Sequence, residues 1–159
     1  MGSKRMRATM AGIASSALLG GALVAGPAAT AAQAAQYTPS SCKYGKVVCI
    51  SKSTRTLRLM VNGRSQMTMS ARFGASSTPT REGVFRVYWK NIDHVSSLYG
   101  SAMPFAMFFS GGQAIHYSSD FARRGYLGAS HGCVNTRNYY DMSFLYRSVP
   151  VGTKVVIYR

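Results

Sequence analysis

The sequence predicts a mainly β domain of sandwich or barrel-like architecture, with one helix near its C-terminal end. Short runs of β-branched and aromatic residues recur along the chain, and several of them alternate apolar and polar side chains. Gly, Pro, Asn and Ser separate these runs at short intervals. One stretch after the last cysteine has a helical pattern with a capping residue, so the expected helix content is small.

The first 34 residues have the organisation of a signal peptide. Lys4, Arg5 and Arg7 precede an uncharged apolar stretch over 10–26, and small residues follow up to Ala34. An uncleaved membrane anchor is the alternative, but the apolar stretch is short against the roughly 20 residues that a span needs. We therefore expect an exported protein with no membrane span after cleavage, organised as signal peptide, N-terminal leader and folded domain over 1–34, 35–45 and 46–159.

Short strands account for most of the domain. They are predicted over 46–50, 56–61, 65–70, 84–89, 105–109, 113–117 and 154–158. Between the second and third of these runs, Asn62-Gly63 predicts a two-residue hairpin turn, because such turns need positive φ at both positions. The stretches 91–99 and 117–129 are expected to be loops, the second of them lying over a site.

The single helix is predicted over 137–147. Thr136 can cap its N-terminus, and Asp141 lies in its first turn, where the helix dipole favours a negative charge. Pro150 and Gly152 follow its end. Its buried stripe is expected to consist of Tyr140, Phe144 and Leu145.

The charge is strongly one-sided. The 159 residues carry a formal net charge of +15 at pH 7, from 19 Lys and Arg against four Asp and Glu. A basic chain often binds nucleic acid, but export argues against that partner, and no Lys/Arg run longer than a pair follows the signal peptide. An anionic cell envelope is the better partner, and solubility alone is the alternative explanation of the charge.

The three cysteines have two different expected fates. Cys42 and Cys49 lie seven positions apart at the start of the domain, and in an exported protein we predict a disulfide between them. That pairing leaves Cys133 as a free thiol. Pairing of either Cys42 or Cys49 with Cys133 remains open as the alternative.

Cys133 is the candidate nucleophile. It lies in the string Ser130-His131-Gly132-Cys133-Val134-Asn135, directly before the predicted helix. A helix N-terminus facing the sulfur would favour the thiolate, which is the reactive form. Gly132 permits a sharp turn and close approach of a substrate. The backbone N–H groups of His131, Gly132 and Cys133 are candidates for an oxyanion hole.

His116 is the candidate base. It ends the strand Ala114-Ile115-His116, and sixteen residues separate it from Cys133. A base needs a partner that orients its ring. Asp120 is one candidate for this partner, and a backbone carbonyl of Tyr117 or Ser118 is another.

A zinc site is the competing interpretation of these residues. His116, His131 and Cys133 are suitable ligand types, but no fourth ligand is evident and their spacing is irregular. We therefore expect neither a metal nor another cofactor.

Four stretches together resemble the catalytic domain of the L,D-transpeptidases, the YkuD type. The string around Cys133 is the most specific of them, and the resemblance extends over 45–159. The other three stretches are the Thr-Pro segment, the strand before the histidine and the histidine strand, at 77–87, 103–109 and 112–116.

The resemblance implies a role for each residue of the site. Cys133 would be the nucleophile and His116 its base, while His131 and Gly132 would shape the oxyanion hole. Ser130 would hold the motif loop. Substrate would be contacted by Asn135, Tyr117 and Ser118.

The family activity implied is cross-linking of peptidoglycan in the cell wall, outside the cytoplasmic membrane. Cys133 would attack a stem tetrapeptide at the carbonyl of its third residue, release D-Ala and pass the thioester to an amine of a second stem, giving a 3→3 cross-link. Water as acceptor would make the protein an L,D-carboxypeptidase. Carbapenems would acylate the same sulfur. A non-enzymatic, basic wall-binding protein is the third interpretation.

Two positions differ from common family patterns. Many members have Arg where this chain has Asn135, and Gly or Ser where it has Tyr117. The first variant occurs within the family, whereas the second bears on acceptor specificity.

Overall fold

A computed structural model describes residues 38–159 of the chain. The predicted signal peptide, 1–34, lies outside the described residues, as does the start of the leader. Within the described part, no helix is long and apolar enough to cross a membrane.

Strands are the main regular structure of the domain, as the sequence predicts. The helical elements are η1 (Ser40–Cys42), α1 (Ser119–Arg124), η2 (Gly125–Leu127) and α2 (Tyr139–Ser148). The strands are β1 (Lys46–Ser51), β2 (Thr56–Val61), β3 (Arg64–Ser70), β4 (Gly83–Arg86), β5 (Trp89–Val95), β6 (Ala102–Ser110), β7 (Gln113–Tyr117), β8 (Val134–Thr136) and β9 (Lys154–Tyr158). The mainly β fold with a helix after the cysteine motif is thereby confirmed.

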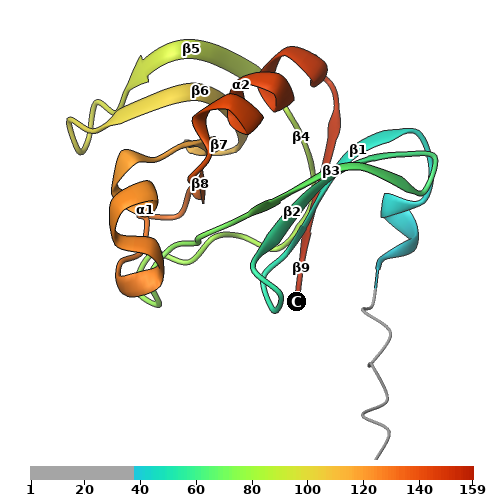
Figure 1. Cartoon of the computed structure of the whole chain (residues 1–159), viewed down its shortest axis with the longest axis horizontal. Coiled ribbons are helices and arrows are strands. Elements are labelled where there is room, and N and C mark those ends of the chain that lie inside the picture. Colours follow the sequence, from blue (N-terminus) through green and yellow to red (C-terminus); the bar gives the residue numbers. More distant parts are fainter. Residues whose placement is uncertain (1–37) are drawn as a thin grey trace, which may run out of the picture. The chain divides into compact units, whose positions relative to one another are not determined.

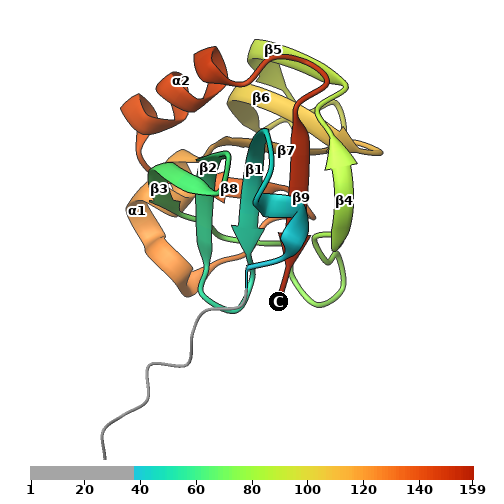
Figure 2. The ribbon, with the colours of Figure 1, turned by 90° about the vertical axis from the view of Figure 1, so that its right-hand side faces the viewer.

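The strands form two sheets that face each other as the layers of a sandwich (Figure 1). The five-stranded sheet has the order β3-β2-β1-β9-β4, and Figure 2 shows these strands side by side. The four-stranded sheet has the order β5-β6-β7-β8. In each sheet one pair is parallel, β1 with β9 and β7 with β8, and the other pairs are antiparallel. The helix α2 lies across one end of the sandwich and contacts β6 and β7.

The main core fills the space between the sheets. Alternation along β6 sends Phe105, Met107 and Phe109 into this core and leaves Ala106 and Phe108 on the outer face of the four-stranded sheet. Strand β7 alternates in the same way, with Ile115 inward and Ala114 outward. The four-stranded sheet is therefore covered on both faces, and its outer face carries the functional side chains described below.

The disulfide lies on the outer face of the other sheet. Cys42 of η1 and Cys49 of β1 are bonded, with their Cα atoms 6.0 Å apart, and both are fully buried in a small cluster with Val47, Met60 and Val156. Cys133 is free. The structure thus has the pairing preferred from the sequence and neither alternative.

The predicted helix is displaced at its start. It begins at Tyr139 and is capped by Asn138, whose Oδ1 accepts from the backbone N–H groups of Tyr140 and Asp141. Thr136, the predicted cap, instead ends β8, where its hydroxyl donates to the carbonyl of His116.

The predicted buried stripe of this helix is wrong apart from Leu145. Tyr140 and Phe144 are exposed, and Met142 is buried with Leu145 against the two sheets. Asp141 lies in the first turn, as predicted.

The predicted strand over 84–89 is two strands. Val87 donates its N–H to Thr153 beside β9, whereas the next residue, Tyr88, donates to Phe108 of β6. The chain therefore passes from one sheet to the other between these two residues. Most of the predicted loop over 91–99 belongs to β5, and the predicted loop over 117–129 contains α1 and η2.

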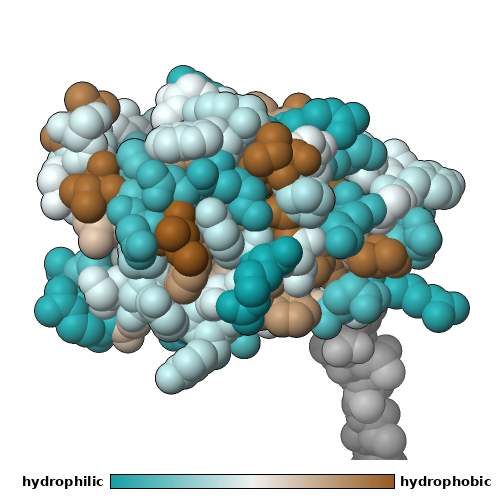
Figure 3. All heavy atoms as spheres, turned by 90° about the horizontal axis from the view of Figure 1, so that it is seen from above, coloured by the Kyte–Doolittle hydropathy of each residue, from teal (hydrophilic) through white to brown (hydrophobic). Residues whose placement is uncertain are grey.

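The surface carries scattered apolar side chains. On the face shown in Figure 3, apolar residues are separated from one another by polar ones and do not join into one patch. Most Lys and Arg side chains face solvent. Of the four acidic residues, Glu82 forms ion pairs with Lys52 and Arg159, and Asp120 forms ion pairs with Arg72 and Arg124.

Candidate active site

Strand register brings the candidate base to the outer face of the four-stranded sheet. Ile115 of β7 faces the core, so the next side chain, His116, projects to the opposite face. In the parallel β7–β8 ladder, His116 pairs with Asn135, and Asn135 in turn forms an antiparallel bridge with Arg72. Cys133 lies beside Ala114 on the same face. The register thus places side chains from three segments of the chain around one site.

These residues line one cavity of about 920 Å³. His116 and Cys133 form part of its wall, together with Ser130, His131 and Asn135 of the motif. The rest of the wall comes from the Thr-Pro segment, the β5–β6 connection, the β6–β7 turn and the start of α1. The structure therefore brings the candidate nucleophile and the candidate base to the same cavity.

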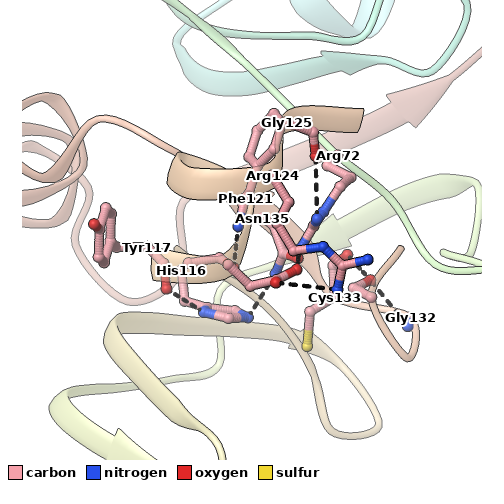
Figure 4. Close-up of polar contacts among 12 residues, drawn as sticks. Arg72, His116, Tyr117, Phe121, Arg124, Gly125, Gly132, Cys133 and Asn135 are labelled. Atoms are coloured by element: carbon pink, nitrogen blue, oxygen red, sulfur yellow. Dashed lines mark hydrogen bonds and ion pairs between the residues drawn. The ribbon is translucent and has the colours of Figure 1, made fainter. Parts of the chain in front are cut away.

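The imidazole of His116 is held at both of its nitrogens (Figure 4). Nδ1 lies 2.6 Å from the carbonyl oxygen of Tyr117, and Nε2 lies 2.9 Å from Nδ2 of Asn135. Burial is the main cause that lowers the pKa of His116 to about 4, with further lowering from the positive charge of Arg72 and from His94. At neutral pH the ring is therefore uncharged and able to accept a proton.

The orienting partner of the base is a backbone carbonyl. Of the candidates from sequence, Tyr117 supplies it, whereas Asp120 pairs with Arg72 and Arg124. The hydrogen bond to this carbonyl raises the pKa of His116, but burial lowers it by more.

The Cys133 thiol is held much more loosely. Its one hydrogen bond in the described structure is from the backbone N–H of Ala114, at 3.5 Å. Burial raises the pKa of this thiol, and the Ala114 N–H opposes the increase. The helix does not begin directly after Cys133, as was expected, because strand β8 follows the cysteine and α2 starts only at Tyr139. The resting site therefore pairs a protonated thiol with a neutral imidazole.

A hydroxyl organises the motif loop. The Oγ of Ser130 donates to the carbonyl of Cys133 at 2.6 Å and accepts from the N–H of Gly132 at 3.2 Å. Of the three N–H groups expected in an oxyanion hole, that of Gly132 is thus engaged within the loop. Gly132 has φ of +112°, a backbone conformation that residues other than glycine rarely adopt.

Gly74 and the Thr-Pro segment contact the motif loop on its other side. Gly74 bridges to Ser130, and a Cβ at Gly74 would lie 1.9 Å from the Thr78 carbonyl and 2.8 Å from the Gly132 nitrogen. The hydroxyl of Thr80 accepts from the N–H of Gly74 and donates to the carbonyl of Cys133. Only glycine allows this close approach of the two segments.

The remaining predicted residues have different surroundings. His131 is exposed at the cavity, and its ring stacks on Tyr99 at 4.0 Å between centroids. Ser118 lines the cavity, but its hydroxyl caps α1 by accepting from the N–H of Phe121. The side chain of Tyr117 packs against Tyr139 and the core, so only its carbonyl reaches the site.

Sequence reasoning missed Arg72. Its side chain is 5% exposed and contacts Asp120, Gly125 and Asn135. In the sequence it is one of many cations, and only the β-bridge to Asn135 places it beside the motif. No local pattern distinguishes it from an arginine in solvent.

The ligands of the zinc alternative do not assemble. Within residues 38–159, no group of three or more His, Cys, Asp or Glu side chains is placed to hold a metal ion. Nε2 of His116 contacts Asn135, and the ring of His131 contacts Tyr99.

A free cysteine and a neutral histidine that line one cavity on a β sandwich define a candidate thiol acyl-transfer site. A sequence profile of the L,D-transpeptidase catalytic domain (YkuD) matches residues 45–157. The chain therefore belongs to the L,D-transpeptidase catalytic domain family. A search of curated protein sequences found no match.

Solved structures of the same family have the same fold. An L,D-transpeptidase from Stackebrandtia nassauensis is 25% identical, with a TM-score of 0.69 over 78% of this chain and 62% of that one. One from Xylanimonas cellulosilytica is 34% identical, with a TM-score of 0.67 over 76% of this chain and 63% of that one. An L,D-transpeptidase in complex with imipenem is 25% identical, with a TM-score of 0.63 over 71% of this chain and 58% of that one. This chain spans less than two thirds of each of these proteins.

Proposed function

We propose that this protein is an L,D-transpeptidase that acts on peptidoglycan stem tetrapeptides through a thioester at Cys133. The observation that carries the proposal is the placement of Cys133 and His116 on one face of the sheet, in one cavity, within the fold of this family. The positive charge of the domain suits an anionic cell wall. Residues 1–34 would direct export, and 46–159 would form the catalytic domain.

In the first half of the reaction, the Cys133 sulfur attacks the carbonyl carbon of the third stem residue. The thiol proton passes to Nε2 of His116, because Nδ1 faces the Tyr117 carbonyl and is not free to accept it. The bond between carbon and nitrogen then breaks, the proton passes to the leaving D-Ala nitrogen, and a thioester remains. The imidazole must turn from Asn135 towards the sulfur for this transfer.

In the second half, an amine of another stem peptide attacks the thioester. His116 accepts a proton from this amine, the bond between carbon and sulfur breaks, and the proton returns to the thiol. The product is a 3→3 cross-link. The backbone N–H groups of His131 and Cys133 are the donors we propose for the oxyanion. Attack by water in place of the amine would give the tripeptide.

The same thiol would be acylated by carbapenems. These ring amides are attacked at a carbonyl carbon, as the stem peptide is, and a family member has been solved in complex with imipenem. Imipenem is therefore a suitable reagent for the first test.

The test is intact-mass spectrometry of the purified protein after incubation with imipenem, beside a Cys133→Ala variant. We expect one adduct in the wild-type protein and none in the variant, with equal thermal stability of the two. An adduct that persists in Cys133→Ala would show that the sulfur is not the acylated atom, and its absence from folded wild type would reject the acyl-transfer proposal.

A second assay separates the two possible acceptors. The protein is given a disaccharide tetrapeptide whose side-chain amine is blocked by acetylation, alone and then with a second stem that carries a free amine. Dimers formed only with the amine support the transpeptidase, whereas tripeptide as the sole product in both reactions would make the protein a carboxypeptidase.

A further inference from the structure

A row of polar side chains, buried except at its far end, runs away from the candidate base. Its buried members are His116, Asn135 and Arg72, which Figure 4 shows side by side, and it ends at the partly exposed Asp120 in the first turn of α1. The first two contacts follow from strand register, because His116, Asn135 and Arg72 are lateral neighbours on the same sheet face. The proposed function uses only the first member of this row.

The donor and acceptor atoms of the row fit together in only one way. Arg72 has N–H donors and no acceptor, so the Asn135 atom at 3.1 Å from its guanidinium must be the amide oxygen, Oδ1. The Asn135 nitrogen, Nδ2, is then the atom at 2.9 Å from Nε2 of His116. An amide nitrogen only donates, so Nε2 must present its lone pair.

The other side of the imidazole completes the assignment. The Tyr117 carbonyl only accepts, so Nδ1 at 2.6 Å must carry the ring proton. The Tyr117 carbonyl and the row together select one of the two neutral tautomers of His116, the one whose Nε2 carries a lone pair, which accepts from Asn135 in the resting site.

Arg72 is itself firmly fixed. Its guanidinium donates to Asp120 Oδ2 at 2.8 Å and to the Gly125 carbonyl at 3.1 Å, and it lies 5.1 Å from the ring centre of Phe121. The Asp120 carboxylate is partly exposed, whereas Arg72, Asn135 and His116 are buried. The amide of Asn135 thus cannot flip without leaving the Arg72 N–H groups facing the amide nitrogen.

The position of Arg72 is costly, which argues for a specific use. Its Nε is buried without a hydrogen-bond partner within residues 38–159, and a buried, unpaired N–H of a charged group is unfavourable. Its positive charge also disfavours a second proton on His116. An arginine at this position destabilises the charged imidazolium form of His116. Through Asn135, it also orients the neutral ring.

We propose that Arg72 is a positioning residue that, through Asn135, helps hold the base His116 in the tautomer whose Nε2 carries a lone pair and no proton. The role in catalysis rests on the proposed function, since it assigns His116 as the base for Cys133. The tautomer itself is a property of the resting protein and is tested without substrate.

The experiment combines NMR with acylation kinetics. Proton–nitrogen correlation NMR of histidine-labelled protein reports which ring nitrogen of His116 is protonated, with the resonances assigned by a His116→Gln variant. The variants are Arg72→Met, Arg72→Lys as the conservative change, and Arg137→Met as the matched control. Arg137 lies over the same Phe121 ring, at 5.7 Å, but is exposed and outside the row.

We expect wild type and Arg137→Met to show a single tautomer with the proton on Nδ1. Arg72→Met should show a mixture of both tautomers and a fall of about 10- to 100-fold in the first-order rate of acylation by imipenem, within the range for a general base. The imipenem concentration at half-maximal rate should change little, and Arg72→Lys should restore part of the rate. A folded Arg72→Met protein that keeps the pure Nδ1–H tautomer would overturn the proposal.

A second variant decides the case in which Arg72→Met fails to fold. Asn135→Asp keeps an acceptor for Arg72 but also presents an acceptor to Nε2, so Nε2 should now carry a proton, either in the other neutral tautomer or in an imidazolium whose Nδ1 still donates to Tyr117. A His116 ring that keeps Nε2 without a proton in Asn135→Asp would overturn the proposal. If wild type shows the Nδ1–H tautomer and forms no imipenem adduct, the positioning by Arg72 stands and the proposed function fails.

Discussion

The proposed base and the proposed nucleophile of this site are held in opposite ways. His116 is bonded at both ring nitrogens and backed by a row of buried polar groups that reaches α1. The Cys133 sulfur has one long contact to a backbone N–H, although the loop that carries it is held by the hydroxyls of Ser130 and Thr80. The imidazole is thus oriented before any substrate arrives, whereas few contacts fix the thiol itself.

The pKa values of the two groups are also shifted in opposite directions. Burial lowers the pKa of His116 and raises that of Cys133, so both effects oppose an ion pair in the empty site. A thiol acquires its nucleophilic form only when its proton has somewhere to go. In the proposed reaction the proton therefore moves during the attack and not before it, and it passes to the neutral imidazole once this ring turns from Asn135 towards the sulfur.

The largest expected effect comes from removing the imidazole of His116 while leaving the Cys133 thiol in place. His116→Ala should slow acylation by imipenem by about 10²- to 10⁴-fold, the usual contribution of general base catalysis. Alkylation of Cys133 by iodoacetamide above pH 9 should be nearly unchanged, because it needs only the thiolate. Both rates are measured by intact mass, with His94→Ala as the histidine control. Equal acylation by wild type and His116→Ala would show that the thiol needs no base.

The second effect is the pH dependence of stability. A folded-state pKa of about 4 for His116 against 6.5 for an unperturbed histidine means that the unfolded state binds more protons between these values. The stability from the neutral ring is complete above pH 6.5 and is lost as the pH falls towards 4. The loss between pH 7 and pH 5 should be about 2 kcal/mol.

Urea unfolding at both pH values measures this loss, and His116→Gln should lack it. The window avoids Glu82 and Asp120, whose pKa values are lowered by their arginine and lysine partners and which lose stability only at more acidic pH. An equal loss in His116→Gln would assign the effect to other groups.

The third effect is on the nucleophile loop. Ser130→Ala removes the bonds to the Cys133 carbonyl and the Gly132 N–H and should cost about 1–2 kcal/mol of unfolding free energy. It should also slow acylation, because the sulfur and the loop N–H groups lose their common support. Ser51→Ala is the matched control, since its hydroxyl also makes two hydrogen bonds but in the five-stranded sheet.

Similar destabilisation with slower acylation only in Ser130→Ala would separate support of the site from support of the fold. A rate loss of the same size in both variants would mean that the loop has no special part in positioning the sulfur.

Local signals were sufficient for much of the fold. Asn62 and Gly63 have φ of +47° and +77°, as the predicted turn requires, and the strands around them lie where alternation placed them. The break within 84–89 could not be found, because Val84 to Trp89 alternates in the same way in either sheet. The hydrogen-bond partners of Val87 and Tyr88, which lie far away in sequence, determine where the chain changes sheets.

The sequence indicated several residues of the candidate site, but not the contacts that these residues make with one another. The motif and the histidine strand indicated Cys133 and His116, whereas the contact of the Asn135 amide with Nε2 of His116 was not foreseen. Arg72 could not be found because its role depends on a bridge between segments 63 positions apart. The thiol was expected at a helix N-terminus, and the three residues of β8 displace that helix from it.

The smallest expected effect concerns the ring that covers the nucleophile loop. Tyr99 stacks on His131 at an interplanar angle of 12°, and aromatic pairs of this kind contribute about 0.5–1.5 kcal/mol when well packed. The ring of Tyr99 is half exposed, so Tyr99→Ala should leave thermal stability almost unchanged and slow acylation by less than about 10-fold, since 1.4 kcal/mol corresponds to one factor of ten. Tyr99→Phe keeps the stacking ring and should react like wild type, as should the exposed control Tyr44→Ala. Rates as low in Tyr99→Phe as in Tyr99→Ala would assign the effect to the hydroxyl, and the cysteine side would then be bonded as specifically as the histidine side.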